Sequence, residues 1–206
     1  MKREHINCFY WYVKRFFDII FSFILIIVTF PLMVLTGICL YINLGKPLFN
    51  QRRYREGLNK KKFLMLKLRT KLLDVDHLPR EQRYTKFSSF IDKTHFNELP
   101  QLFNVLIGDM SFIGPRPFIP GEDLPEGKIS EKRYLVRPGL SGLAYIHGGI
   151  YISYEDKLRY DEEYYDNFGF MQDLKILLLT PREMIRQGGK YYEKKAKKSK
   201  KLKNNT

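Results

Sequence analysis

Five charged residues in this sequence have the types needed to bind and transfer a phosphate group. The cations are Lys67, Arg69, Arg116 and Arg137, and the carboxylate is Glu98. Phosphoryl transfer requires cations or Mg²⁺ to neutralise charge on the transferring group, and the planar fork of arginine grips phosphate with two hydrogen bonds. A single cation is more often a solvated or structural charge, so the prediction of a phosphate site rests on their combination.

Short rigid elements carry the predicted cations. Residues 63–70 alternate like a strand, which places Lys67 and Arg69 on one face. The proline-rich stretches Gly114-Pro-Arg-Pro117 and Arg137-Pro-Gly139 are expected to form stiff turns that each present one arginine. The arginine between two prolines, residue 116, is the first candidate for phosphate contact, whereas the arginine at 137 fits a structural role equally well.

The carboxylate lies where a helix is expected to begin. Pro100 is tolerated in a helix only in its first turn, so the N-cap should lie near Asn97, a favoured capping residue. Free N–H groups and the positive end of the helix dipole make such a terminus suitable for phosphate. Glu98 fits a Mg²⁺ ligand, or a favourable charge in the first turn. Apolar residues continue the helical spacing at Leu99, Leu102, Phe103 and Leu106.

Other common chemistries lack their signatures in this sequence. It contains no phosphate-cradling glycine loop, no zinc motif and no Ser-His-Asp order. Cys8 and Cys39 are too few for a disulfide framework, and they are expected to be reduced thiols. The four histidines show no spacing that suggests a shared metal.

A long apolar segment predicts attachment to a membrane. No charged residue occurs from Ile19 to Leu44, and a straight helix of that length would measure about 39 Å, against roughly 30 Å of bilayer hydrocarbon. Pro31 should kink the helix, and basic residues flank the segment on both sides, which favours the cytoplasm for both ends. We therefore expect a re-entrant helix–break–helix over residues 13–44 rather than a simple span.

The charge of the whole chain indicates an anionic partner. Lys and Arg number 36 against 22 Asp and Glu, which gives a net charge of +14. Nucleic acid, anionic lipid and phosphorylated substrates all satisfy this charge. No nucleic-acid-binding motif accompanies it, so we expect no nucleic-acid partner. The lysine-rich residues 190–206 are expected to form a solvated or lipid-surface tail.

Several long motifs resemble the monotopic polyprenyl-phosphate phosphoglycosyl transferases, also called bacterial sugar transferases. The resemblance covers nearly the whole chain. Its motifs are the basic entry and Pro-broken apolar helix, Lys67-Leu-Arg-Thr70, the stretch from Glu98 to Ser111, Gly-Pro-Arg-Pro117, and Arg137 to Ala144.

The resemblance implies both a reaction and a cellular setting. An aspartate would attack a UDP-sugar with the help of Mg²⁺, release a nucleoside monophosphate, and pass the sugar 1-phosphate to polyprenyl (undecaprenyl) phosphate. This is the first membrane step of glycan or exopolysaccharide biosynthesis, at the cytoplasmic face of the bacterial membrane. Partners would be the nucleotide-sugar donor, the polyprenyl phosphate, membrane lipids, and either a second copy or a downstream glycosyltransferase.

The sequence departs from the family at the nucleophile. Where the family has an Asp-Glu pair, this chain has Asn97-Glu98, and a neutral amide is a poor nucleophile. Nearby, Asp92 replaces the usual arginine and His95 the usual serine. Three possibilities stay open: Asp92 makes the attack, the lipid phosphate attacks the donor directly, or the protein is a catalytically silent paralogue that regulates or scaffolds glycan assembly.

The expected architecture is a small α/β, mostly helical domain on an N-terminal re-entrant, Pro-kinked membrane helix. All of residues 1–206 would form one sugar-transferase domain. Within it we expect the membrane helix at 13–44, a cytoplasmic core of the catalytic type at 45–189, and the basic tail at 190–206.

Overall fold

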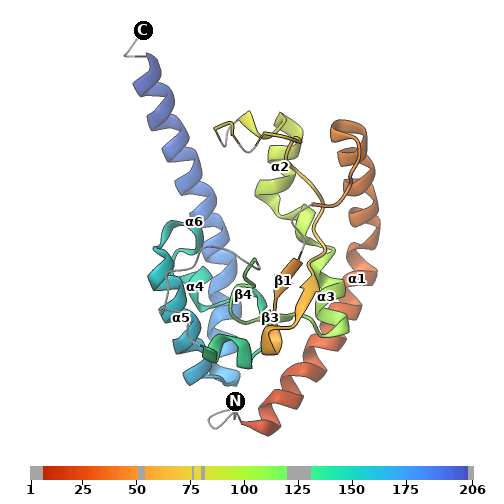
Figure 1. The fold of residues 1–206 in the computed structure, drawn as a ribbon, viewed down its shortest axis with the longest axis vertical. Coiled ribbons are helices and arrows are strands. Elements are labelled where there is room, and N and C mark those ends of the chain that lie inside the picture. The colour runs from red at the N-terminus through yellow and green to blue at the C-terminus, as the bar shows by residue number, and fades with distance from the viewer. Residues whose placement is uncertain (1–6, 51–53, 76, 80–81, 120–130, 204–206) are drawn as a thin grey trace.

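The computed structural model of the protein is mostly helical, with two small sheets between its longest helices (Figure 1). It describes residues 7–50, 54–75, 77–79, 82–119 and 131–203. The helices are α1 (Cys8–Leu44), α2 (Lys86–Thr94), α3 (Gln101–Ile107), α4 (Leu143–Ile146), α5 (Tyr154–Asp166) and α6 (Phe170–Lys203), and the strands are β1 (Tyr54–Glu56), β2 (Lys62–Leu64), β3 (Ser111–Ile113) and β4 (Gly139–Ser141).

Helix α1 is the one described helix that is long and apolar enough to cross a membrane. The side chain of Asn7 caps its start by accepting a hydrogen bond from the Tyr10 amide at 3.2 Å. The predicted break at Pro31 does not occur, because helical structure continues through it to Leu44. The helix axis nevertheless changes direction along its length (Figure 1).

One narrow face of α1 packs against the protein, and most of its remaining surface is exposed and apolar. The buried residues of this face recur every three or four positions, as expected for one side of a helix. Ile26 and Met33 on that face form a core cluster with Leu102 of α3. Nearer the N-terminus, Asp18 accepts hydrogen bonds from the Ser111 hydroxyl at 3.1 Å and the Phe112 amide at 3.2 Å. The exposed face includes Phe16, Phe21, Phe23, Ile27, Val28, Phe30, Leu35, Ile38 and Ile42.

The two proline turns predicted from the sequence lie against each other at the β3–β4 pair. These strands are parallel, with Ser111 beside Gly139 and Ile113 beside Ser141. A Cβ atom on Gly114 would lie 2.2 Å from the Arg137 carbonyl oxygen, and one on Gly142 would lie 2.2 Å from the Gly114 oxygen. Both positions therefore require glycine for the close approach of the backbones. The chain after Gly142 forms the short helix α4, followed by a 3₁₀ turn (Gly149–Tyr151).

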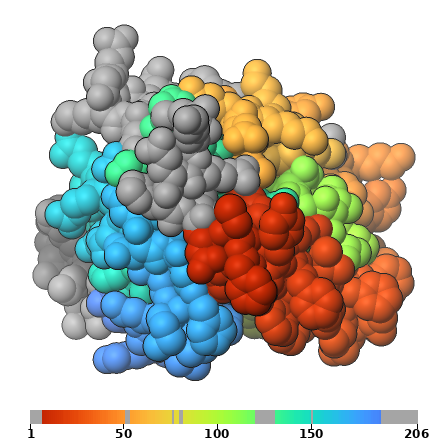
Figure 2. Space-filling view, turned by 90° about the horizontal axis from the view of Figure 1, so that it is seen from below, coloured from red at the N-terminus to blue at the C-terminus, as the bar shows by residue number. Residues whose placement is uncertain are grey.

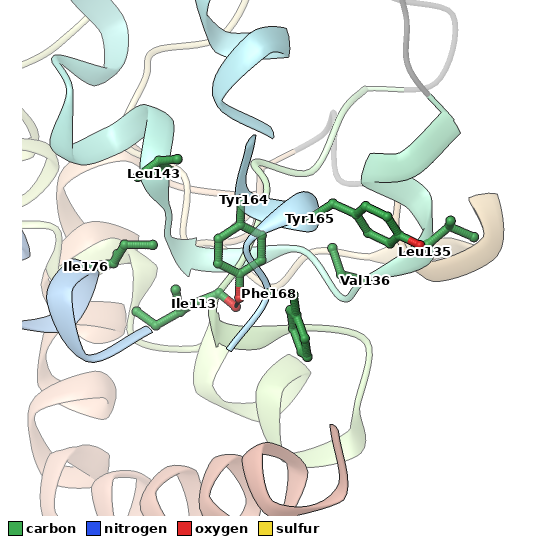
Figure 3. Packing of buried hydrophobic residues seen from close by; sticks show 8 residues of the cluster. All are labelled: Ile113, Leu135, Val136, Leu143, Tyr164, Tyr165, Phe168 and Ile176. Carbon is green, nitrogen blue, oxygen red and sulfur yellow. Dashed lines mark hydrogen bonds between the residues drawn. The ribbon is translucent and has the colours of Figure 1, made fainter. Parts of the chain in front are cut away.

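Helix α6 closes the molecule on the side away from α3 (Figure 1). Its Ile176 joins Tyr164 and Phe168 in the largest buried apolar cluster (Figure 3). The carboxylate of Asp173 lies 2.8 Å from the Tyr164 hydroxyl, accepts a hydrogen bond from Tyr10 at 2.6 Å, and forms an ion pair with Lys14. These contacts hold the N-terminal ends of α1 and α6 side by side (Figure 2).

Two helices, α5 and α6, form the C-terminal part of the described chain. Helix α5 is acidic and rich in tyrosine, and Ser153 is its N-cap. The apolar stretch 173–180 belongs to α6, and this helix continues to Lys203, so residues 190–203 of the predicted tail extend it. The side chains of 187–203 lie outside the described part of the chain.

The end of α1 is fixed by Arg69, whose side chain is buried at 5% exposure. Its guanidinium donates hydrogen bonds to the carbonyl oxygens of Leu44 and Gly45, both at 2.8 Å. It also donates to the carbonyl oxygens of Pro47 at 2.7 Å and Lys71 at 2.9 Å. The last carbonyls of a helix have no partner within the helix, so Arg69 supplies the donors that they lack.

Replacement of Arg69 by lysine should lower the stability of the folded protein. A compact ammonium cannot reproduce the planar fork that reaches four carbonyls, so buried acceptors lose their donors. We expect the free energy of unfolding to fall by about 2 to 3 kcal/mol, measured by denaturant unfolding in detergent micelles. The matched control is Arg159→Lys, whose side chain is 66% exposed and should change stability by less than about 0.5 kcal/mol. Equal effects of both substitutions would contradict this role.

Candidate functional site

A cluster of charged side chains surrounds Glu98, at the turn between α2 and α3. The Glu98 carboxylate accepts a hydrogen bond from the Lys67 ammonium at 2.6 Å. Nδ1 of His95 lies 3.4 Å from the same carboxylate oxygen. The side chains of all three are partly exposed, at 22% for Lys67, 34% for Glu98 and 43% for His95. A substrate phosphate can therefore approach them from solvent.

Local structure explains why these residues meet. Helix α2 ends at His95, whose φ of 59° is left-handed, and a 3₁₀ turn (Phe96–Glu98) leads to Pro100. A non-glycine residue at positive φ is uncommon and reverses the chain sharply. The Leu68 amide donates to the Asn97 carbonyl at 2.9 Å, which places Lys67 beside the turn. Asn104 of α3 fixes the same segment through the Leu66 amide at 2.9 Å and the Leu64 carbonyl at 2.8 Å.

Asn97 does not cap a helix, contrary to the sequence prediction. Helix α3 begins at Gln101 with Pro100 in the N-cap position, and no side chain caps it. The Asn97 side chain is fully buried, at 0% exposure. Its amide nitrogen lies 3.4 Å from Asp92, and its Oδ1 atom has no hydrogen-bond partner. The prediction failed because the 3₁₀ turn delays the start of the helix by three residues.

Asp92 lies on the last turn of α2, directly beside Asn97. Its Oδ1 atom accepts a hydrogen bond from the Thr70 hydroxyl at 3.0 Å, and the Asn97 amide approaches the same oxygen. The side chain is half-buried. Asn97, at the position of the family's nucleophile, and Asp92, the candidate to replace that nucleophile, are therefore in contact with each other.

Electrostatics keep Glu98 ionised. Burial by itself would raise the pKa of Glu98, but the charge of Lys67 and the hydrogen bond and charge of His95 outweigh burial and hold the pKa well below its usual range. In turn, the hydrogen bond from Glu98 raises the pKa of His95 against the opposing effect of burial. Burial, followed by the negative charges of Glu98 and Glu183, raises the pKa of Tyr145 to about 12.

The three predicted arginines lie apart from the Glu98 cluster. Arg69 binds backbone carbonyls at the end of α1, as described above, so we assign it a structural role. Arg137 donates to the Gly108 carbonyl at 2.9 Å and lies over the Trp11 ring at 5.0 Å. It thus occupies the opposite end of α3 from Glu98, which agrees with the structural alternative.

Arg116 is exposed on the turn after β3. Its carbonyl accepts a hydrogen bond from Arg133, which is paired with Asp161 at 3.2 Å. Burial raises the pKa of Asp161 to about 6, although the positive charges of Arg133 and Arg116 oppose this rise. Arg116 therefore neighbours the Arg133–Asp161 pair, and no hydrogen bond or ion pair within the described residues links it to Glu98.

Sequence reasoning assigned no role in the site to His95, Tyr145 or Glu183. A signal for His95 was present, because it precedes Glu98 by three residues at a predicted helix boundary. No local pattern marks Tyr145 or Glu183, because they belong to α4 and α6 and tertiary packing alone determines which charges act on Tyr145.

The oxygen atoms of the turn fit a Mg²⁺ ion whose remaining ligands come from substrate and water. Mg²⁺ commonly uses one or two protein oxygens together with substrate phosphates. Glu98 offers its second carboxylate oxygen, and the neighbouring Asn97 Oδ1 lacks a hydrogen-bond partner. No cluster of three or more His, Cys, Asp or Glu side chains suited to a metal occurs in the described part of the chain. A metal at this turn would therefore depend on the substrate for its ligands.

Comparison with known proteins identifies relatives that are named as sugar transferases or sugar phosphate transferases. The chain is 38% identical over 177 residues to the uncharacterized sugar transferase EpsL of Bacillus subtilis, covering 84% of this chain and 87% of EpsL. It is 34% identical to the UDP-glucose:undecaprenyl-phosphate glucose-1-phosphate transferase of Caulobacter vibrioides, covering 86% of this chain and 72% of that enzyme.

A third relative is considerably longer than this chain. The undecaprenyl-phosphate galactose phosphotransferase of Salmonella typhimurium is 30% identical over 202 residues, and the match covers 87% of this chain but 42% of that enzyme. Residues 9–187 match the model of the bacterial sugar transferase family, and this range includes the Glu98 cluster, nearly all of α1 and the N-terminal half of α6. The chain belongs to the bacterial sugar transferase family.

Proposed function

We propose that this protein moves a sugar 1-phosphate from a UDP-sugar to undecaprenyl phosphate, as the first membrane step in building a glycan or exopolysaccharide. The observation that carries the proposal is the partly exposed Lys67–Glu98–His95 cluster, which the segment 67–70 joins to the end of the apolar helix α1. The UDP-sugar donor is soluble and its diphosphate is negatively charged, so the reaction needs cations. The acceptor is a membrane lipid, so these cations must lie close to a membrane anchor. Relatives named for this reaction with glucose or galactose support it.

Residues of the cluster have distinct roles in this proposal. Lys67 would contact the diphosphate of the donor and offset the charge that develops on the leaving phosphate. Glu98, kept ionised by Lys67 and His95, would hold Mg²⁺ together with the Asn97 oxygen, and a bound Mg²⁺ would supply further neutralisation of phosphate charge. Arg116 is the exposed cation available for the outer part of the donor. Arg69 and Arg137 maintain the fold.

A second candidate function follows from the amide at position 97. An asparagine buried at 0% exposure cannot replace an attacking carboxylate, which supports a catalytically silent paralogue that regulates or scaffolds glycan assembly. Release of UMP distinguishes the transferase from the catalytically silent paralogue. Release of UMP by the unaltered protein identifies an enzyme, whereas release only after Asn97→Asp identifies a silent paralogue with an intact substrate site.

For the membrane, we propose a monotopic placement at the cytoplasmic face. Helix α1 would enter and leave through the same leaflet, because basic residues flank it on both sides. The start of α1 lies beside the start of α6 (Figure 2), and the two segments carry the exposed apolar side chains of Phe9, Tyr12 and Phe16 and of Phe170 and Met171. Together these faces form an apolar surface suited to the membrane interface.

Loss of the Lys67 charge should reduce turnover strongly. UMP release would be measured from UDP-glucose and UDP-galactose with undecaprenyl phosphate and Mg²⁺. We expect Lys67→Met to lower the rate by about 10²- to 10³-fold, because removing one donor to a developing negative charge has that effect. Removing Mg²⁺ with a chelator should also abolish release. The control is Lys132→Met, whose exposed ion pair with Asp166 lies outside the cluster. Release that needs neither Lys67 nor the lipid phosphate would refute the proposal.

Cysteine labelling should show both ends of α1 on one side of the membrane. Cys8 is exposed at the start of α1 and Lys46 follows its end. In a Cys39→Ser background, Cys8 and a cysteine in the Lys46→Cys variant should both react with an impermeant maleimide in inverted membrane vesicles, and neither in right-side-out vesicles. Labelling of the two positions from opposite sides would establish a spanning helix instead.

A further inference from the structure

Two buried charges lie behind the exposed Arg116. Arg133 belongs to the 3₁₀ turn Glu131–Leu135 and Asp161 to α5, and their side chains form an ion pair at 3.2 Å with exposures of 3% and 5%. Both charges lose their hydration on burial, so apolar residues of similar volume often stabilise a protein as well as a buried ion pair does. A role for this pair is therefore expected from the groups that it binds, rather than from its own attraction.

Both charges bind the backbone of Arg116. The Arg133 guanidinium donates a hydrogen bond to the Arg116 carbonyl, and the Asp161 carboxylate accepts one from the Arg116 amide. The neighbouring residues Pro115 and Pro117 have no backbone N–H and a restricted φ, so this amide is the one donor of the stretch 115–117. The pair thus holds the backbone of Arg116 at two points, while the side chain stays exposed.

Phe118 gives Arg133 a second contact with the segment that carries Arg116. The Arg133 guanidinium carbon lies 3.2 Å from the centre of the Phe118 ring, a cation–π contact, and that ring stacks on Tyr154 of α5 at 5.8 Å between centroids. The Phe118 carbonyl accepts a hydrogen bond from the Glu56 amide of β1 at 2.9 Å. The segment after β3 is therefore attached to both β1 and α5.

We propose that Asp161 and Arg133 are positioning residues, which hold the backbone of Arg116 so that its guanidinium meets a phosphate of the UDP-sugar donor. This inference rests on the proposed function, in which Arg116 is the exposed cation for the donor. A fixed backbone lowers the conformational entropy lost on binding, because less of the chain has to be ordered when the guanidinium contacts phosphate. Loss of the pair should therefore weaken donor binding through Arg116 and leave binding of the lipid acceptor unchanged.

The test is a double-mutant cycle on the full-length protein in detergent with Mg²⁺. The Kd of UDP-glucose and of UDP-galactose would be measured by calorimetric titration, and the KM of each donor and of undecaprenyl phosphate from UMP release. We expect Arg116→Ala to raise the donor Kd and KM by about 10- to 100-fold, the range for loss of a charged hydrogen bond. Asp161→Asn should raise them by about 10-fold in the unaltered protein, but by less than about 2-fold in the Arg116→Ala background. The KM of undecaprenyl phosphate should not change.

A paired apolar replacement separates positioning from stability. Asp161→Asn leaves the Arg133 charge buried and unpaired, which destabilises the fold. Arg133→Met combined with Asp161→Leu removes both charges at similar volume, so the melting temperature should change little, while the donor Kd should still rise by about 10-fold. The matched control is Lys132→Met combined with Asp166→Leu, which removes an ion pair at 2.8 Å between the same two elements, with side chains 43% and 44% exposed. It should leave the donor Kd and both KM values unchanged.

Three results would overturn the proposal while UMP release continues. An unchanged donor Kd in Arg116→Ala would show that this arginine does not contact the donor. An unchanged donor Kd in the folded apolar variant would give the pair a purely structural role. Multiplicative effects of Arg116→Ala and Asp161→Asn would show that the pair acts independently of Arg116.

Failure of the transferase function gives different results. Donor binding that follows the expected cycle, without UMP release in the presence of the lipid, would refute turnover and retain the positioning role. Absence of both binding and UMP release with the two donors would refute the proposed function and this inference together.

Discussion

The structure depends on satisfying the backbone carbonyls at the C-terminal ends of α1 and α3. These groups have no partner within their helices, and an unpaired carbonyl is costly where apolar surroundings exclude water. Arg69 supplies donors to Leu44 and Gly45 at the end of α1. Arg15 does the same for Val105 and Leu106 at the end of α3, both at 2.6 Å, and Arg137 does so for Gly108.

The same hydrogen bonds position the Glu98 cluster relative to the membrane helix. Arg69 and Lys67 belong to one extended segment, so fixing the guanidinium at the end of α1 also fixes the lysine two residues earlier. The amide of Leu68, between them, binds the Asn97 carbonyl. The position of Lys67 is therefore tied to the end of α1. This coupling suits a reaction in which a soluble donor must meet a lipid acceptor.

The turn between α2 and α3 contains both buried and solvent-exposed side chains. Asn97 is buried and contacts Asp92, while His95 and Glu98 on either side of it are partly exposed. A 3₁₀ turn places consecutive side chains about 120° apart, so neighbours in sequence point in different directions. The residue at position 97 thus affects the packing of the turn, and the residues around it determine what the substrate meets.

The sequence by itself determined the features that depend on composition and local pattern. The uncharged apolar run predicted the long helix α1, and the two proline-rich stretches predicted the turns that carry Arg116 and Arg137. Tertiary structure alone decided which partner each charge meets. The strand pattern placed Lys67 and Arg69 together, but one binds Glu98 and the other binds four carbonyls. The periodicity of a sequence predicts on which face of an element a side chain lies. The interactions of that side chain depend on residues from distant parts of the chain that pack against the same face.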